Sequence, residues 1–163
     1  MNLVNKTTLF EHPTIYENAT IYYGEEYSPG ISDNYCLLLS DLGFDTYGSE
    51  LPGGTYYRLD IYVPLEVGNP NKIPAGTYTV DMSDSYDPWT ISKSYSGYHI
   101  MDESGENYLS FDNPGSGTLV VGEDGSITAT ITMLASGITH EISYNAGDIV
   151  IYNNVPSAFA VRK

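Results

Sequence analysis

The chain has 163 residues, which is enough for one domain with a hydrophobic core and too few for two ordinary domains. Its formal net charge is -15, with only six Lys and Arg, so it cannot assemble the basic patch that binding to nucleic acid or an anionic membrane requires. We therefore expect a single domain over residues 1–163, with no nucleic-acid partner and no direct membrane insertion.

The composition favours an exported protein. Tyr occurs sixteen times, against four Phe and one Trp, and charged residues make up only 17% of the chain. A surface of hydroxyls, amides and tyrosine rings is typical of exported bacterial β-proteins. Residues 1–12 contain no apolar run of the kind a signal peptide needs. The chain is then either cytoplasmic or the mature part of an exported protein, and we favour the second interpretation.

The first half of the chain reads as short strands, after an N-terminal segment of residues 1–18 that we expect to be extended or flexible. Apolar residues recur at every second position, which is the period of a strand and not of a helix. Glycine, proline, asparagine and aspartate separate the runs. The predicted strands are residues 19–23, 34–40, 55–63, 76–82, 97–101 and 107–111.

The stretch "DMSDSYDPWTISKSY", residues 81–95, has several interpretations. Asp81, Asp84 and Asp87 supply the hard oxygen ligands that Ca²⁺ prefers, but the glycine of an EF-hand turn is absent and three monodentate acids leave the ion short of ligands. A surface crossing whose short side chains bond the local backbone is the interpretation that we favour. We expect no cofactor here, with calcium as a weak alternative.

The second half contains the clearest pattern. In residues 127–133, Ile127 and Ile131 share one face and Thr128 and Thr130 the other. Residues 138–144 repeat the alternation, with Ile138 and Ile142 expected to be buried and Thr139 and Glu141 exposed. Short glycine-containing links join these runs to residues 117–121, which predicts an antiparallel meander over 117–144. Two closing strands are expected at 148–152 and 158–161.

About ten short strands and no helix predict an all-β fold, either an antiparallel β-sandwich or a flattened β-barrel. The longest links are residues 24–33, 42–54 and 65–75. Function in such folds is usually carried by long loops on a rigid scaffold.

Several segments of the chain follow a familiar pattern. They are "IPAGTYTVD" at 73–81, "SGTLVVGEDGSITATITM" at 116–133 and "GITHEISYNAGDI" at 137–149, with "YYG" at 22–24 and "DNYCLLLSD" at 33–41 nearer the N-terminus. Together they resemble a recurrent all-β module of secreted and surface lipoproteins of Bacteroidetes, whose opening the last two segments match. The resemblance implies a location in the cell envelope, at the surface or outside the cell. It transfers no catalytic residue.

The sequence offers no catalytic motif. His12, His99 and His140 lie in no nucleophile, zinc or phosphate motif, and His140 falls on the apolar face of its strand, as a hydrogen-bonded core histidine does. Cys36, the single cysteine, is expected to be a small buried hydrophobe. We therefore expect no enzymatic activity.

Four aromatic residues are the candidate ligand contacts: Tyr86, Trp89, Tyr95 and Tyr98. They lie close together in the sequence beside acids and amides, and rings with a polar handle suit a wet binding surface. For Trp89 we favour a structural interpretation, as a plug of the core, over a ligand contact. The expected function is a binding or structural module that recognises a glycan or a surface protein, as in adhesion. A barrel-type carrier of a small apolar ligand, lined by His140 and tyrosines, is the alternative, and a glycoside-processing enzyme comes third.

Overall fold

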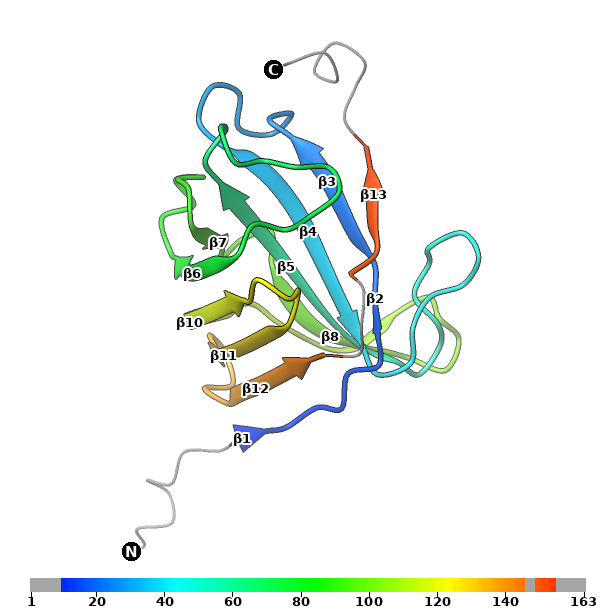
Figure 1. Cartoon of the computed structure of the whole chain (residues 1–163). Coiled ribbons are helices and arrows are strands. Elements are labelled where there is room, and N and C mark those ends of the chain that lie inside the picture. Colours follow the sequence, from blue (N-terminus) through cyan, green and yellow to red (C-terminus); the bar gives the residue numbers. More distant parts are fainter. Residues whose placement is uncertain (1–9, 146–148, 155–163) are drawn as a thin grey trace, which may run out of the picture.

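The computed structural model describes residues 10–145 and 149–154 of the chain (Figure 1). These residues form thirteen strands and contain no helix. The all-β prediction is confirmed. The strands are β1 (Phe10–Glu11), β2 (Glu17–Asn18), β3 (Thr20–Gly24), β4 (Asp33–Ser40), β5 (Thr55–Val63), β6 (Gly76–Asp81), β7 (Thr90–Ser92), β8 (Gly97–Met101), β9 (Tyr108–Asp112), β10 (Pro114–Val121), β11 (Ile127–Met133), β12 (Thr139–Tyr144) and β13 (Ile151–Asn153).

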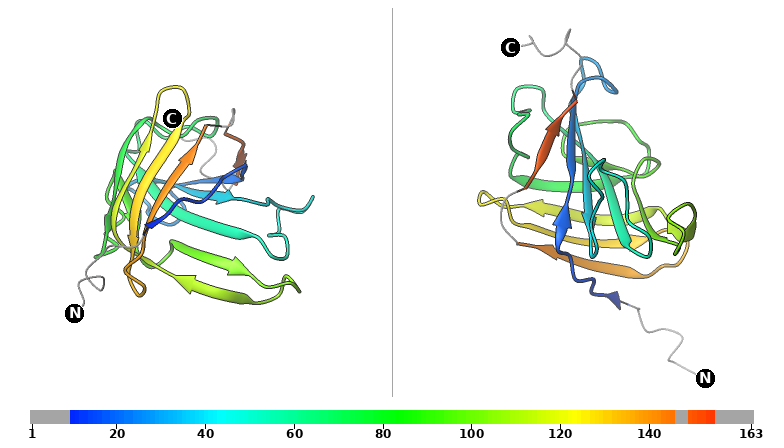
Figure 2. Two further views of the ribbon diagram at one scale, coloured as in Figure 1. Left: turned by 90° about the horizontal axis from the view of Figure 1, so that it is seen from below. Right: turned by 90° about the vertical axis from the view of Figure 1, so that its right-hand side faces the viewer.

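The strands form one sandwich-like sheet that does not close among the described residues. Its order is β1-β12-β11-β10-β6-β7-β5-β4-β3-β13, with β2 beside β4, and β8 joining β5 to β9. In Figure 1, β3, β4 and β5 run steeply while β10, β11 and β12 run across the view, and Figure 2 shows the sheet bending between these groups. Each half therefore covers the inner face of the other.

Most neighbouring strands are antiparallel, and the predicted meander of β10, β11 and β12 is confirmed. Three pairs are parallel: β1 with β12, β6 with β7, and β13 with β3. The short strands β1, β2 and β7 were not predicted. Strand β7 corrects the view of residues 81–95 as a plain crossing, because Ile91 and Ser92 are buried beside β5 and β6. The predicted strand at 158–161 lies outside the described residues.

The core lies between the two halves of the sheet. The alternation assigned to β11 and β12 largely holds: Ile127, Ile131 and Ile142 are buried, while Thr128, Thr130 and Glu141 are exposed. The buried cluster of this interior also includes Tyr35, Leu37, Leu39, Tyr57, Leu59, Ile61, Tyr78, Leu119 and Tyr144.

Two residues at the start of β12 differ from the prediction. Thr139 was expected to be exposed and is buried, because β1 pairs with it at the edge of the sheet and its hydroxyl is 2.7 Å from that of Thr132. Ile138 was expected to be buried and is only half-buried, since it precedes the strand. The described part of the chain contains no helix long and apolar enough to cross a membrane.

Candidate ligand-binding pocket

The outer face of β4 and β5 is polar and forms the floor of a pocket. Along β5, Leu59 and Ile61 face the core, so the alternate residues Arg58, Asp60 and Tyr62 point the other way. The antiparallel register places Cys36 of β4 opposite Asp60. Asn34 stands opposite Tyr62 in the same register. One face of this pair thus builds the core and the other offers polar groups to a cavity.

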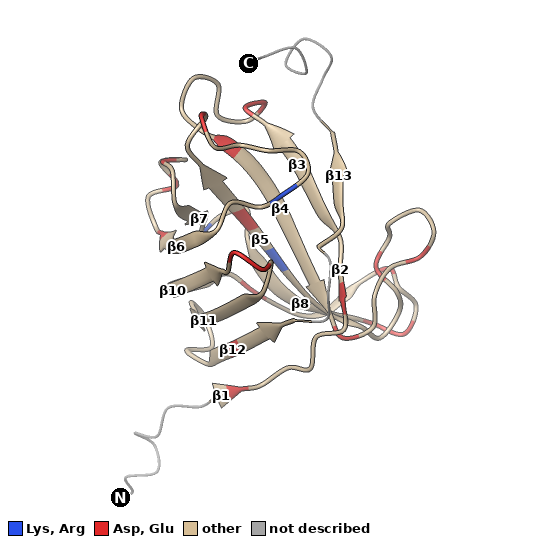
Figure 3. Ribbon diagram, viewed as in Figure 1, with Lys and Arg blue, Asp and Glu red and all other residues tan. Residues whose placement is uncertain are grey.

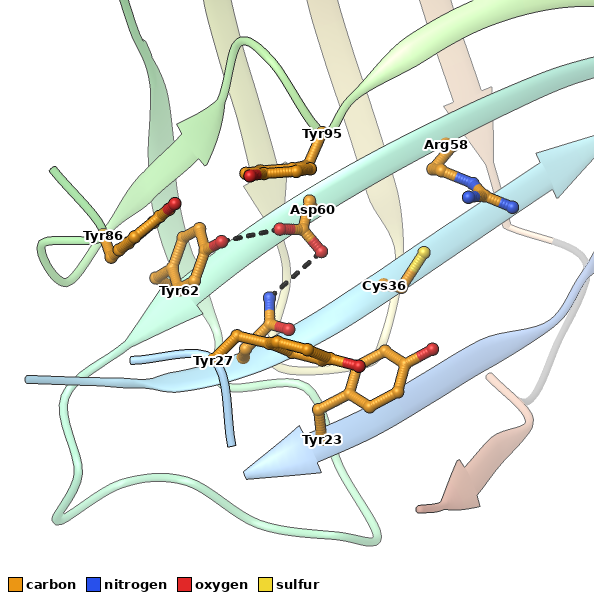
Figure 4. Close-up of a pocket in the computed structure, with 9 residues that line it drawn as sticks. Tyr23, Tyr27, Cys36, Arg58, Asp60, Tyr62, Tyr86 and Tyr95 are labelled. Carbon is orange, nitrogen blue, oxygen red and sulfur yellow. Dashed lines mark hydrogen bonds between the residues drawn. The ribbon is translucent and has the colours of Figure 1, made fainter. Parts of the chain in front are cut away.

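Tyrosine rings form the walls of this cavity, which has a volume of about 390 Å³. Tyr23 comes from β3 and Tyr27 from the turn that follows it, whereas Tyr86 and Tyr95 come from the two loops flanking β7 (Figure 4). Tyr27 and Tyr95 are more than half exposed. We call this site the tyrosine pocket; its lining is Tyr23, Tyr27, Asn34, Cys36, Arg58, Asp60, Tyr62, Tyr86 and Tyr95.

The rings of the tyrosine pocket contact one another in pairs. The ring centroids of Tyr62 and Tyr86 are 5.2 Å apart, and those of Tyr86 and Tyr95 are 6.5 Å apart. Tyr23 and Tyr27 meet edge to face at 5.2 Å. These spacings are typical of interacting aromatic pairs, so neighbouring rings support one another's positions.

Asp60 is the acidic group of the floor. Its carboxylate accepts hydrogen bonds from the Tyr62 hydroxyl at 2.6 Å and from Asn34 Nδ2 at 3.1 Å (Figure 4). Its backbone N–H donates to Ser96 Oγ, which fixes the strand beside the loop. Burial raises the pKa of Asp60, and the bonds from Tyr62 and Asn34 oppose that shift. The chain therefore holds a half-buried carboxylate against a cavity at a cost in stability.

Cys36 and Arg58 complete the floor. Burial raises the pKa of the Cys36 thiol to about 12, so it is an inert, protonated group, in agreement with the predicted small buried residue. Arg58 is exposed and lies at the end of the pocket away from Tyr62 and Tyr86 (Figure 4). The pocket is therefore acidic at the end where most of its rings gather and basic at the other.

The loop before β7 is held by its own acids. Asp81 accepts bonds from the hydroxyls and backbone N–H groups of Ser83 and Ser85. Asp84 accepts from the Ser92 hydroxyl at 2.7 Å and from the backbone N–H of Lys93 at 2.8 Å. The serine bonds lower the pKa of Asp81. Burial alone would raise the pKa of Asp84, but the bonds from Ser94, Ser92 and Lys93 outweigh it and lower that pKa. The two carboxylates thus fold the loop.

The same loop contains three non-glycine residues with positive φ: Asp84 at 50°, Tyr86 at 65° and Trp89 at 67°. Such backbone is strained for bulky residues and persists only where the surroundings enforce it. The Ser32 hydroxyl donates to the Tyr86 carbonyl at 2.6 Å, and the Trp89 N–H donates to the Tyr62 carbonyl at 2.7 Å. These contacts hold the loop in place over the floor.

The structure separates the four predicted ligand contacts. Tyr86 and Tyr95 line the tyrosine pocket. Trp89 packs instead against the core, 5.2 Å from the Tyr78 ring, which matches its structural interpretation. Tyr98 contacts Tyr57 and His140 and lines a different cavity. The sequence grouped these residues because they are close in the chain, but the two loops that flank β7 and the strand β8 place them at three different sites.

The candidate calcium ligands do not converge. Asp81 and Asp84 bond different parts of the loop, and Asp87 is exposed. No group of three or more His, Cys, Asp or Glu side chains within residues 10–145 and 149–154 is arranged to hold a metal ion.

Two of the histidines are buried. His140 Nδ1 is 2.7 Å from the Tyr57 hydroxyl, as expected for a hydrogen-bonded core histidine, and burial lowers the pKa of its imidazole. His99 pairs with Glu50 through Nε2, and its Nδ1 has no partner among the described residues. His12 lies at the surface, 3.5 Å from Glu141.

Sequence reasoning missed Asn34, Asp60, Tyr62, Tyr23 and Tyr27 as site residues. A signal for part of this floor was present: "RLDIY" places Arg58, Asp60 and Tyr62 on one face of a strand whose other face is apolar. Polar residues at alternate positions on a strand with a solvated outer face are ordinary, so the pattern becomes informative only once a loop covers it.

Comparisons with protein-family models, curated proteins and solved structures found no match to this chain.

Proposed function

We propose that the chain is a non-catalytic, exported binding module that recognises a glycan in the tyrosine pocket. The observation that carries this proposal is the combination of five tyrosine rings with hydrogen-bonding groups on one floor: Asn34, Asp60 and Arg58. Apolar ring faces suit the C–H faces of a sugar, and carboxylate, amide and guanidinium groups suit its hydroxyls. Pockets of about this size commonly bind small ligands.

The architecture of the pocket supports binding. Its floor lies on two paired strands, and its covering loop is fixed by Asp81 and Asp84, so its rings are held before a ligand arrives. A preorganised site loses little conformational freedom on binding. The tyrosine-rich surface and the resemblance to secreted Bacteroidetes modules support export to the envelope or surface as part of the same proposal.

Adhesion to a protein is the second candidate function. Strand β9 pairs only with β8 among the described strands, and its residues Tyr108, Leu109 and Phe111 are each more than half exposed. Exposed apolar residues on an edge strand suit a protein surface. If β9 mediates adhesion, Leu109→Ser should reduce adhesion to target cells while Tyr86→Ala should not.

The other two hypotheses have less support. The described side chains between the halves of the sheet pack into one core cluster. The Tyr57 hydroxyl is hydrogen-bonded to His140 Nδ1 within that interior. Neither observation favours a carrier of an apolar ligand. A glycoside-processing enzyme needs two carboxyl groups facing one sugar. Asp60 is the only carboxylate in the lining of the tyrosine pocket.

Affinity electrophoresis of the purified chain against a panel of soluble polysaccharides tests the glycan proposal. We expect retardation by at least one polysaccharide and a loss of roughly tenfold or more in affinity for Tyr86→Ala and Tyr95→Ala, because each change removes a wall of the pocket. Tyr16→Ala is the matched control, since Tyr16 is 63% exposed and lies outside the pocket. Equal losses in all three variants would count against the site.

A further inference from the structure

The tyrosine pocket has a carboxylate where its rings gather, a combination that suits a cation. Asp60 lies on the floor beside Tyr62, and the ring of Tyr86 packs on Tyr62. Tyrosine faces attract an ammonium group through their quadrupole, and a carboxylate among them adds a direct charge interaction. Rings around an acid therefore distinguish an ammonium group from a hydroxyl.

The carboxylate of Asp60 does not use all of its hydrogen-bond acceptor capacity within the described structure. Its two oxygens accept one side-chain hydrogen bond each, from Asn34 and from Tyr62, whereas a carboxylate can accept about four. Arg58, the only basic side chain of the lining, makes no ion pair with Asp60. Asp60 therefore retains acceptor capacity toward the cavity.

The surroundings favour a cation as well. The chain carries 21 acids against six Lys and Arg, and Figure 3 shows the acids spread over many loops around the sheet. Such an excess of negative charge raises the local concentration of cations. Arg58 lies at the far end of the pocket and is available to the hydroxyl groups of a ligand (Figure 4).

Resting on the proposed glycan function, we infer that the tyrosine pocket selects a sugar with a free, protonated amino group. The ammonium group lies against the Asp60 carboxylate among the rings of Tyr62, Tyr86 and Tyr95. N-acetylation of that amine removes the charge and enlarges the group, so an acetylated sugar binds more weakly.

Isothermal titration calorimetry with matched probes tests this inference. The probes are a glucosamine tetrasaccharide and its fully N-acetylated counterpart, at a mildly acidic pH that keeps sugar amines protonated. Choline and its uncharged carbon isostere 3,3-dimethylbutan-1-ol isolate the contribution of the charge. We expect the amino tetrasaccharide to bind roughly tenfold or more tightly than the acetylated one, and choline to bind more tightly than its isostere.

Two variants with equal charge change locate the effect. Asp60→Asn and Asp87→Asn each remove one negative charge, but only Asp60 lines the pocket. We expect Asp60→Asn to lose about tenfold or more in affinity for choline and for the amino tetrasaccharide, and Asp87→Asn to keep both affinities. Circular dichroism of each variant confirms that it is folded.

The outcomes distinguish this inference from the proposed function. If the acetylated tetrasaccharide binds as well as the amino form and Asp60→Asn has no effect, the amine preference is wrong and glycan binding stands. If choline binds through Asp60 but neither tetrasaccharide nor any polysaccharide binds, the glycan function is wrong and the inferred sugar selection falls with it. If no probe binds, the amine preference is overturned, and the glycan function is overturned as well only if no polysaccharide of the panel binds.

Discussion

Asp60 lies in β5 on the floor of the pocket, whereas Asp81 and Asp84 hold the loop before β7, and the two kinds of acid have opposite environments. Asp60 accepts one hydrogen bond on each oxygen, faces a cavity, and has a pKa raised by burial. The oxygens of Asp81 accept hydrogen bonds from the hydroxyls and N–H groups of two serines, and these bonds lower the pKa of its carboxyl. A carboxylate whose oxygens accept several hydrogen bonds from the chain stabilises the local structure. A buried carboxylate that accepts fewer bonds lowers the stability of the fold but can still bind a ligand.

The largest expected effect concerns Trp89, which belongs to the part of the loop that builds structure. Its ring packs on Tyr78 and so closely over Gly76 that a Cβ there would lie 2.6 Å from it. Trp89→Ala should therefore cost about 3 kcal/mol of unfolding free energy, measured by urea denaturation, because it leaves a void. If Trp89→Ala proves as stable as the wild type, Trp89 does not belong with the structural residues.

The next effect concerns Asp84. Asp84→Ala removes acceptors of the Ser92 hydroxyl and the Lys93 N–H, and places alanine at a positive φ. We expect a loss of about 2 kcal/mol in urea denaturation, together with weaker ligand binding as the loop carrying Tyr86 loosens. Asp87→Ala is the control and should change stability by less than about 0.5 kcal/mol, because Asp87 is exposed.

Acid titration should separate the two kinds of carboxylate by sign. A lowered pKa means that Asp81 contributes stability above the pKa of about 4 of an unfolded chain, and that this stability is lost as the pH falls. The raised pKa of Asp60 means the reverse, since protonation favours the folded form. Between neutral pH and about pH 3, Asp81→Asn should lose less stability than the wild type and Asp60→Asn more. If the urea midpoint falls with pH at the same rate in the wild type and in both variants, the two kinds of carboxylate do not differ in their effect on stability.

The smallest expected effect is that of calcium. The oxygens of Asp81 and Asp84 already accept bonds from the loop, so an ion would have to displace those donors. Millimolar Ca²⁺ should stabilise the chain by less than about 0.5 kcal/mol, as a ligand at or below its dissociation constant does. A rise in Tm of many degrees in differential scanning calorimetry would show that the loop acids bind the ion after all.

The fold was predictable where local pattern and packing agree. Ile127 and Ile131 alternate with threonines in a strand flanked by glycine turns, so side-chain period, turn chemistry and burial all indicate one structure. Strand β7 was not predictable, because its three residues pair in parallel with β6 only after the loop has turned. Short strands defined by distant partners leave no periodic signal.

The candidate site was predictable only in part. Tyr86 and Tyr95 stood out as aromatic residues beside acids, and both line the pocket. The acid that completes the pocket, Asp60, lies more than twenty residues earlier, and no local pattern links it to the loop. Tyr86 faces the pocket and Trp89 packs against the core, and both have a positive φ that neither residue type signals in a sequence.

Because Tyr86 has a positive φ, mutations at this position that stabilise the fold should differ from those that preserve ligand binding. Glycine at position 86 would relieve a conformation that costs a bulky residue about 1 to 2 kcal/mol, and the ring it removes is only half-buried. At position 89 the packing of the indole outweighs the same relief. A random library screened for heat resistance alone should therefore accumulate glycine at position 86 and retain tryptophan at 89, whereas a library screened for ligand capture should keep an aromatic ring at both.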